Sequence, residues 1–136
     1  MLKRELQLTK SDATVQNITQ IHFIGWPDHG VPADAAVSDF EVMLQYFIEW
    51  NLKSADHEKS IVHCSAGIGR TGTTISLMNS VIAISAQRNA GIKDPHFSLF
   101  HTVRQLREHR WGSVQTYVQY EFMYHFLRYW AKKVFK

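Results

Sequence analysis

The residues best suited to chemistry lie around Cys64, the only cysteine in the chain. The apolar Ile61 and Val62 precede it, and a glycine-punctuated segment over 67–72 follows it. This order predicts the end of a buried strand, then a loop, then a helix over 73–87. Such a loop directs backbone N–H groups and the positive end of a helix dipole to one point, which predicts an anion-binding site.

Cys64 and Arg70 indicate which anion chemistry this site could perform. A thiolate is the reactive form of cysteine, and the pKa of a thiol falls from about 8.5 to about 3.5–7.5 at a helix N-terminus or beside a cation. Arg70 carries a planar fork of donors that fits two oxygens of a phosphate. The spacing between the two residues predicts a loop around a tetrahedral dianion, with the sulfur beneath the phosphorus.

Two further segments accompany the cysteine segment, which reads His63-Cys64-Ser65-Ala66-Gly67-Ile68-Gly69-Arg70-Thr71-Gly72. The upstream one reads Trp26-Pro27-Asp28-His29-Gly30-Val31-Pro32, and the downstream one reads Gln115-Thr116-Tyr117-Val118-Gln119-Tyr120. In chain order, they resemble the mobile acid loop, the signature loop and the glutamine loop of the phosphotyrosine-specific protein tyrosine phosphatases.

Each of these motifs has a simpler explanation when taken alone. An aspartate in a segment rich in proline and glycine, such as Asp28, is usually a turn residue. Gln115 would be a surface residue near a helix start, and Cys64 would be a buried, inert thiol beside a glycine turn. The occurrence of all three motifs in the order of one family favours the functional explanation.

The resemblance implies two-step hydrolysis of phosphotyrosine in protein substrates through a phosphocysteine, with no metal and no other cofactor. Cys64 would be the nucleophile, and Asp28 would act first as general acid and then as general base. Gln115, together with Gln119, would orient the attacking water.

The resemblance also implies which residues hold the phosphate. Fixed donors would stabilise the charge of the transition state, as phosphoryl transfer requires. Thr71 would hydrogen-bond the sulfur, and His63 would brace the loop and favour the thiolate. The expected substrate-binding residues are Asp28, Ser65, Ala66, Gly67, Ile68, Gly69, Arg70, Gln115 and Gln119.

Three other functions fit parts of the sequence. A catalytically impaired phosphotyrosine-binding module is disfavoured by the intact catalytic residues. A dual-specificity phosphatase would suit the short length, but the acid-loop and glutamine motifs speak against it. Gly67-x-Gly69-x-x-Gly72 also matches a dinucleotide fingerprint, yet the acidic residue about twenty positions on would be Asp94, at an expected helix start rather than a strand end.

The remaining sequence predicts the elements that position these residues. Alternating apolar and polar side chains predict strands over 5–9 and 14–24, joined by a turn at 11–13. Two prolines and two glycines predict a loop over 25–32, and charged residues predict a connection over 51–59.

Apolar residues at helical spacing predict helices on both sides of the cysteine loop. The helix over 73–87 is apolar nearly all round, so we expect it to be central and buried. Asp94 and Pro95 form a favourable helix start. The other helices are expected from Val37 to Ile48, from Pro95 to Leu106 and from Val114 to Trp130.

The resemblance covers nearly the whole chain, but it corresponds only to the C-terminal half of a domain of this family. It implies an α/β fold, a twisted mixed β-sheet flanked by helices, in which residues 1–136 form a partial catalytic domain and its N-terminal part is missing. Such a piece would leave apolar surface uncovered. We therefore expect it to be poorly soluble or weakly active by itself.

The composition, 45% hydrophobic and 12% aromatic over 136 residues, is that of one globular domain. The N-terminal residues lead into no apolar segment, and serines interrupt the most apolar helix. Neither a signal peptide nor a membrane-spanning segment is therefore expected. A single cysteine cannot form an internal disulfide, and a reactive thiolate survives best in a reducing compartment, so we expect the cytoplasm.

The net charge of +3 favours acidic, phosphorylated partners. The basic residues of the C-terminal part lack an aromatic stacking pattern, which indicates a solvated face rather than a nucleic-acid surface. They are Arg104, Arg107, Arg110, Lys132, Lys133 and Lys136.

The eight histidines show no metal-site spacing, so no metal is expected. None of these patterns addresses the oligomeric state.

Overall fold

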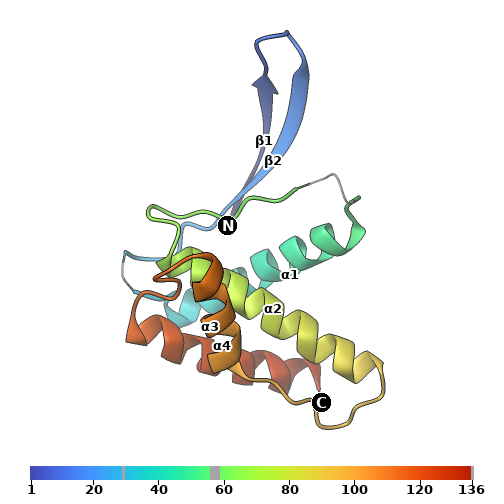
Figure 1. Cartoon of the computed structure of the whole chain (residues 1–136), viewed down its shortest axis with the longest axis vertical. Helices are drawn as coiled ribbons and strands as arrows, with labels where there is room; N and C mark the ends of the chain where they lie inside the picture. Colours follow the sequence, from blue (N-terminus) through green and yellow to red (C-terminus); the bar gives the residue numbers. More distant parts are fainter. Residues whose placement is uncertain (29, 56–58, 136) are drawn as a thin grey trace.

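The computed structural model describes residues 1–28, 30–55 and 59–135 (Figure 1). His29 of the acid loop, residues 56–58 of the expected connection and Lys136 lie outside this part. The elements are β1 (Leu2–Thr9), β2 (Val15–His22), the 3-10 helix η1 (Asp34–Ala36), α1 (Val37–Lys53), α2 (Gly69–Asn89), α3 (Leu99–His109) and α4 (Tyr117–Val134). The helices pack into one body, from which the β1–β2 hairpin projects.

Strands β1 and β2 pair in antiparallel register from Leu2 opposite His22 to Thr9 opposite Val15. The two expected strands are therefore confirmed, with shifted ends. Asp12 shapes the turn between them, because its carboxylate accepts hydrogen bonds from the Thr14 N–H at 2.9 Å and the Thr14 hydroxyl at 2.5 Å.

One face of the hairpin carries apolar side chains that the helical body does not cover. Leu2, Leu6 and Leu8 alternate along β1, and Ile18 lies opposite Leu6 on β2. Their exposed fractions range from 40% to 48%. The hairpin therefore stands outside the main core, as the expectation of uncovered apolar surface implies.

The strand predicted to end at Ile61 and Val62 does not form. Ser60 to Cys64 run outside any β-ladder, and the Ile61 side chain is 85% exposed. A strand is stabilised by hydrogen bonds to a neighbouring strand, and this segment has none beside it in the described part of the chain. The apolar, β-branched residues here indicated a strand that its surroundings do not support.

The helices agree with the sequence pattern in number and order, and differ mainly at their ends. Helix α2 begins at Gly69, four residues before the expected start, so Arg70 lies in its first turn. Helix α3 is capped by Ser98, whose hydroxyl accepts from the His101 N–H at 3.2 Å, and not by Asp94. None of the described helices is both long and apolar enough to span a membrane.

The core lies between α1, α2 and α4, with Phe40 at its centre and 0% exposed. The Phe40 ring meets the rings of Phe23, Trp26, Phe122 and Phe126 edge-on, at centroid distances of 5.3–5.8 Å. This cluster, which we call the Phe40 cluster, joins the acid loop through Trp26 to α1 and α4.

Replacing Phe40 with alanine is expected to lower the free energy of unfolding by about 3–5 kcal/mol, because a large cavity would open among rigid aromatic neighbours. Urea unfolding followed by circular dichroism measures this. Phe100→Ala is the matched control, since Phe100 is 67% exposed, and it should cost less than about 0.5 kcal/mol. Equal losses in the two variants would show that the Phe40 cluster is not the core.

Candidate active site

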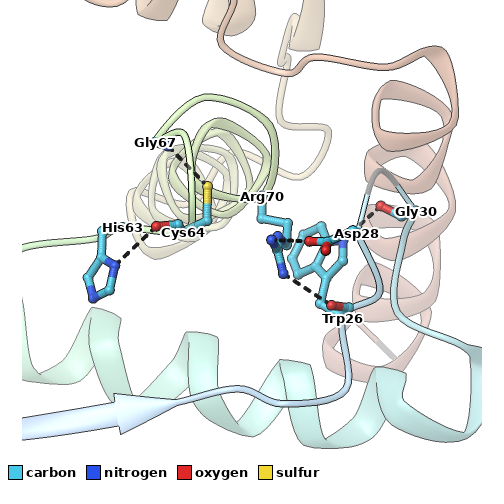
Figure 2. Close-up of polar contacts among 7 residues, drawn as sticks. All are labelled: Trp26, Asp28, Gly30, His63, Cys64, Gly67 and Arg70. Carbon is cyan, nitrogen blue, oxygen red and sulfur yellow. Dashed lines mark hydrogen bonds and ion pairs between the residues drawn. The ribbon is translucent and has the colours of Figure 1, made fainter.

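Residues 64–68 form a tight loop that leads into α2 at Gly69 (Figure 2). Gly67 has a φ of +69°, a left-handed conformation that glycine adopts at little cost. This turn brings the Gly67 N–H to 3.3 Å from the Cys64 sulfur, to which it donates a hydrogen bond. The loop thus places the thiol among backbone donors close to a helix N-terminus, as the sequence predicts.

The surroundings of Cys64 lower the pKa of its thiol from its ordinary value to about 7. Burial acts in the opposite direction, because it disfavours the charged form. It is outweighed by hydrogen bonds from the Thr71 hydroxyl, the Thr71 N–H and the N–H groups of Gly67 and Ile68. The Thr71 hydroxyl is buried and has no partner with regular hydrogen-bond geometry among the described residues, so it is available to the sulfur.

Arg70 extends from the first turn of α2 to the acid loop. Its Nη2 donates to Asp28 Oδ1 at 2.5 Å, and its Nη1 donates to the Trp26 carbonyl at 3.3 Å. The buried Trp26 ring anchors this loop, since its Nε1 donates to the Gly30 carbonyl at 2.7 Å. Figure 2 shows Arg70 lying between the sulfur and the acid loop. A phosphate would therefore compete with Asp28 for this guanidinium.

These groups surround an open pocket of about 180 Å³. Its lining residues are Asp28, Cys64, Ser65, Ala66, Gly69, Arg70, Gln115 and Gln119. A larger, mainly apolar groove of about 460 Å³ borders it at Gln115 but is not lined by the Cys64 thiol. The smaller pocket is therefore the site at which the chemistry would occur.

Among the described residues, no three His, Cys, Asp or Glu side chains lie close enough together to hold a metal ion.

The two glutamines reach the pocket from the segment before α4 and from its first turn. Gln119 is 1% exposed, and its Oε1 accepts hydrogen bonds from the Gln115 N–H at 3.0 Å and the Thr116 N–H at 3.3 Å. It thereby completes a capping box with Thr116. Gln119 has a structural task that its sequence position did not indicate. The Gln115 side chain makes no such bond within the described part of the chain, and it faces the start of α2 at Gly69.

The glutamine segment packs directly against the cysteine loop. The Val114 N–H donates to the Ile68 carbonyl at 3.1 Å, and a Cβ at Gly72 would approach the Val114 nitrogen to 2.6 Å. Val114 itself has a φ of +60°, which costs a β-branched residue of order 1–3 kcal/mol. Its side chain is 2% exposed, so burial and the hydrogen bond hold the strained backbone in place.

Two arginines predicted to lie on a solvated face bind loop carbonyls instead. Arg110 donates from Nε to the Gly67 carbonyl and from Nη2 to the Ala66 carbonyl, both at 3.0 Å. Arg107 donates to the carbonyls of Ser113 and Val114, both at 2.9 Å. The sequence could have predicted these contacts, because both arginines lie near the end of an expected helix, where cations commonly bind free carbonyls.

His63 lies at the base of the loop. Its exposed ring places Nδ1 3.3 Å from the carbonyl oxygen of the adjacent Cys64. No other hydrogen bond from this ring to the cysteine loop is present in the described part of the chain. The hydrogen bonding of His63 therefore supports a bracing effect only on the residue next to it.

Comparison with known proteins decides the family. The family model of the protein-tyrosine phosphatase matches residues 1–129. The chain belongs to this family. As a protein-tyrosine phosphatase family member, it has the α/β fold class that the sequence predicts, and the motif residues described above lie within the matched range.

The chain is similar to full-length phosphatases over part of their length. Human tyrosine-protein phosphatase non-receptor type 20 is 39% identical over 115 residues, which cover 85% of this chain and 24% of that protein. Mouse receptor-type tyrosine-protein phosphatase epsilon is 36% identical over 117 residues, which cover 86% and 15%. The crystal structure of TcPTP1, a protein tyrosine phosphatase of Trypanosoma cruzi, has a TM-score of 0.74 and 32% identity over 96% of this chain and 40% of that one. The chain thus spans about a quarter or less of these curated relatives.

The pKa of the Cys64 thiol gives a direct test of the site. The rate of alkylation by iodoacetamide should rise with pH around a midpoint of about 7, because only the thiolate reacts. Thr71→Val, which removes the hydroxyl donor and keeps the side-chain shape, should raise this midpoint by about one unit.

Thr74→Val is the matched control, since the Thr74 hydroxyl donates to the Arg70 carbonyl at 2.9 Å and not to the sulfur. Its midpoint should equal that of the wild type. An unshifted midpoint in Thr71→Val would show that the hydroxyl does not stabilise the thiolate.

Proposed function

We propose that the chain hydrolyses phosphotyrosine in proteins through a phosphocysteine, and that residues 1–136 form the C-terminal half of the catalytic domain. The observation that carries this proposal is the convergence of a low-pKa thiol, inward N–H donors, Arg70 and Asp28 on one pocket. The exposed apolar face of the hairpin and the match to 40% of the TcPTP1 chain support the second part.

In the first step, the Cys64 thiolate attacks the phosphorus, an S–P bond forms, and the bond to the tyrosine oxygen breaks. The phosphate takes the Arg70 guanidinium from Asp28, and the loop N–H groups bind its equatorial oxygens. The leaving phenolate, whose conjugate acid has a pKa near 10, receives the proton of Asp28. The contact between Arg70 and Asp28 supports this role, because it already brings the carboxyl group over the pocket.

In the second step, a water oriented by the Gln115 amide attacks the phosphocysteine. Asp28, now a carboxylate, accepts a proton from this water, and the S–P bond breaks to release phosphate and regenerate the thiolate. The donors that lower the pKa of Cys64 make its sulfur a better leaving group here. The pocket position of Gln115 supports its role.

The proposed location follows from the same thiol. A free thiolate with a lowered pKa is open to oxidation, so we infer that the protein works in a reducing compartment such as the cytoplasm, in phosphotyrosine signalling. The relatives include both a receptor-type and a non-receptor type phosphatase.

A second candidate, phosphotyrosine binding without turnover, is favoured by two observations. The pocket is open and small, about 180 Å³, and the chain matches 40% of the solved TcPTP1 chain. A site of this kind could retain the phosphate cradle and still lack groups that turnover needs.

The test is a rapid-quench reaction of the 136-residue chain with a phosphotyrosine peptide, analysed by mass spectrometry. The wild type should carry a phosphoryl group on Cys64 and release phosphate in a vanadate-sensitive reaction. Cys64→Ser should form no adduct. Asp28→Asn should slow adduct formation by about 10²–10⁴-fold, because the leaving group would lose its proton donor. Asp34→Asn, which changes an exposed carboxylate outside the pocket, should react as the wild type does.

The outcomes separate the candidates. Phosphopeptide binding without adduct or phosphate release would establish the binding module and contradict hydrolysis. Equal rates with a phosphoserine peptide would contradict specificity for phosphotyrosine, and turnover by Cys64→Ser would exclude the phosphocysteine.

A further inference from the structure

The backbone of Arg110 is fixed by contacts at the end of α3. Its N–H donates to the Leu106 carbonyl at 2.9 Å, and its own carbonyl accepts from the Ser113 hydroxyl at 2.7 Å. From this position the guanidinium reaches the cysteine loop, 43 and 44 residues earlier in the chain. It packs so closely against the turn that a Cβ at Gly67 would lie 3.2 Å from its Nη2.

The two carbonyls that Arg110 binds belong to neighbouring peptide groups. The Ala66 carbonyl shares a peptide plane with the Gly67 N–H, and the Gly67 carbonyl shares one with the Ile68 N–H. In a trans peptide the C=O and N–H point in opposite directions, and no described peptide bond is cis. Two carbonyls held on the Arg110 side therefore direct two N–H groups to the opposite side, where the Gly67 N–H meets the Cys64 sulfur at 3.3 Å.

The loop needs such a constraint because Gly67 is free to rotate. Glycine crosses between positive and negative φ at little cost, so the peptide groups on either side of Gly67 could turn over. A turned peptide group would present a carbonyl oxygen, an acceptor, to the sulfur in place of a donor. The planar fork of an arginine can hold both carbonyls at once.

We propose that Arg110 is a positioning residue that keeps the Gly67 and Ile68 N–H groups directed at the Cys64 sulfur. It binds the outer side of the loop and does not line the pocket. These N–H groups are two of the donors that lower the pKa of Cys64. The effect of Arg110 on the pKa of the Cys64 thiol does not depend on turnover. An effect of Arg110 on the hydrolysis of phosphotyrosine rests on the proposed function.

A positive charge alone would also favour a thiolate, and both Arg110 and Arg70 of α2 carry one. The charge of Asp28, in the acid loop, acts in the opposite direction. His63 precedes the cysteine, and its Nδ1 lies 3.3 Å from the Cys64 carbonyl oxygen. Two substitutions separate these causes. Arg110→Lys keeps the positive charge but cannot bridge two carbonyls with a planar fork. Arg110→Gln removes the charge as well. Arg104→Gln is the control, because Arg104 lies on α3, the helix that Arg110 follows, and its side chain is 70% exposed with Nε 3.8 Å from Glu108 Oε1.

The measurement is the pH midpoint of Cys64 alkylation by iodoacetamide at 0.5 M salt, which screens exposed charges. Arg110→Lys and Arg110→Gln should both raise the midpoint from about 7 by about one unit, and Arg104→Gln should leave it unchanged. A wild-type midpoint in Arg110→Lys with a raised one in Arg110→Gln would overturn the proposal in favour of simple charge. Unshifted midpoints in both would overturn it outright.

A second measurement needs no substitution and remains decisive if a variant unfolds. In the wild type, the amide proton shifts of Gly67 and Ile68 should titrate with the same midpoint as the thiol. If neither amide follows the thiol, the proposal is wrong. A chain that shows these titrations but hydrolyses no phosphotyrosine would contradict the proposed function and leave the positioning role intact.

Discussion

The arrangement of this chain depends on stabilising a negative charge on one partly buried sulfur. Burial disfavours that charge, so the Cys64 thiol ionises near neutral pH only because several donors point at it from fixed places. The donors lie on one short turn and on the first residues of α2. Helix α2 contacts α1, α3 and α4, so the packing of the whole helical body keeps that turn in place.

Much of this could be predicted from the sequence, because the deciding signals are local. The spacing of Cys64 and Arg70, the proline and glycine residues around Asp28 and the apolar period of the helices are all contained in short windows. The structure brings these three residues to one pocket together with Gln115. Central burial of α2 also follows from its pattern, since apolar residues occupy nearly every face of it.

Other features could not be predicted, because they depend on what lies next to a segment in space. Ile61 has the character of a strand residue, but the described part of the chain places no strand beside it for pairing. Arg110 looks like any basic helix residue until its partners, more than 40 positions away, are known. Gln119 has a family motif position, yet its buried amide also caps a helix. In each case the sequence shows the residue type and the tertiary contact decides its task.

The projecting hairpin has a consequence for how copies of this chain meet one another. In a two-stranded antiparallel ribbon, each strand pairs along one side and leaves a row of backbone groups open along the other, which is a template for cross-chain pairing. The uncovered leucines of β1 lie beside one such row. The tip of this arm points away from the helices (Figure 1), so strand pairing along its edge would join molecules through the arm and not through the helical body.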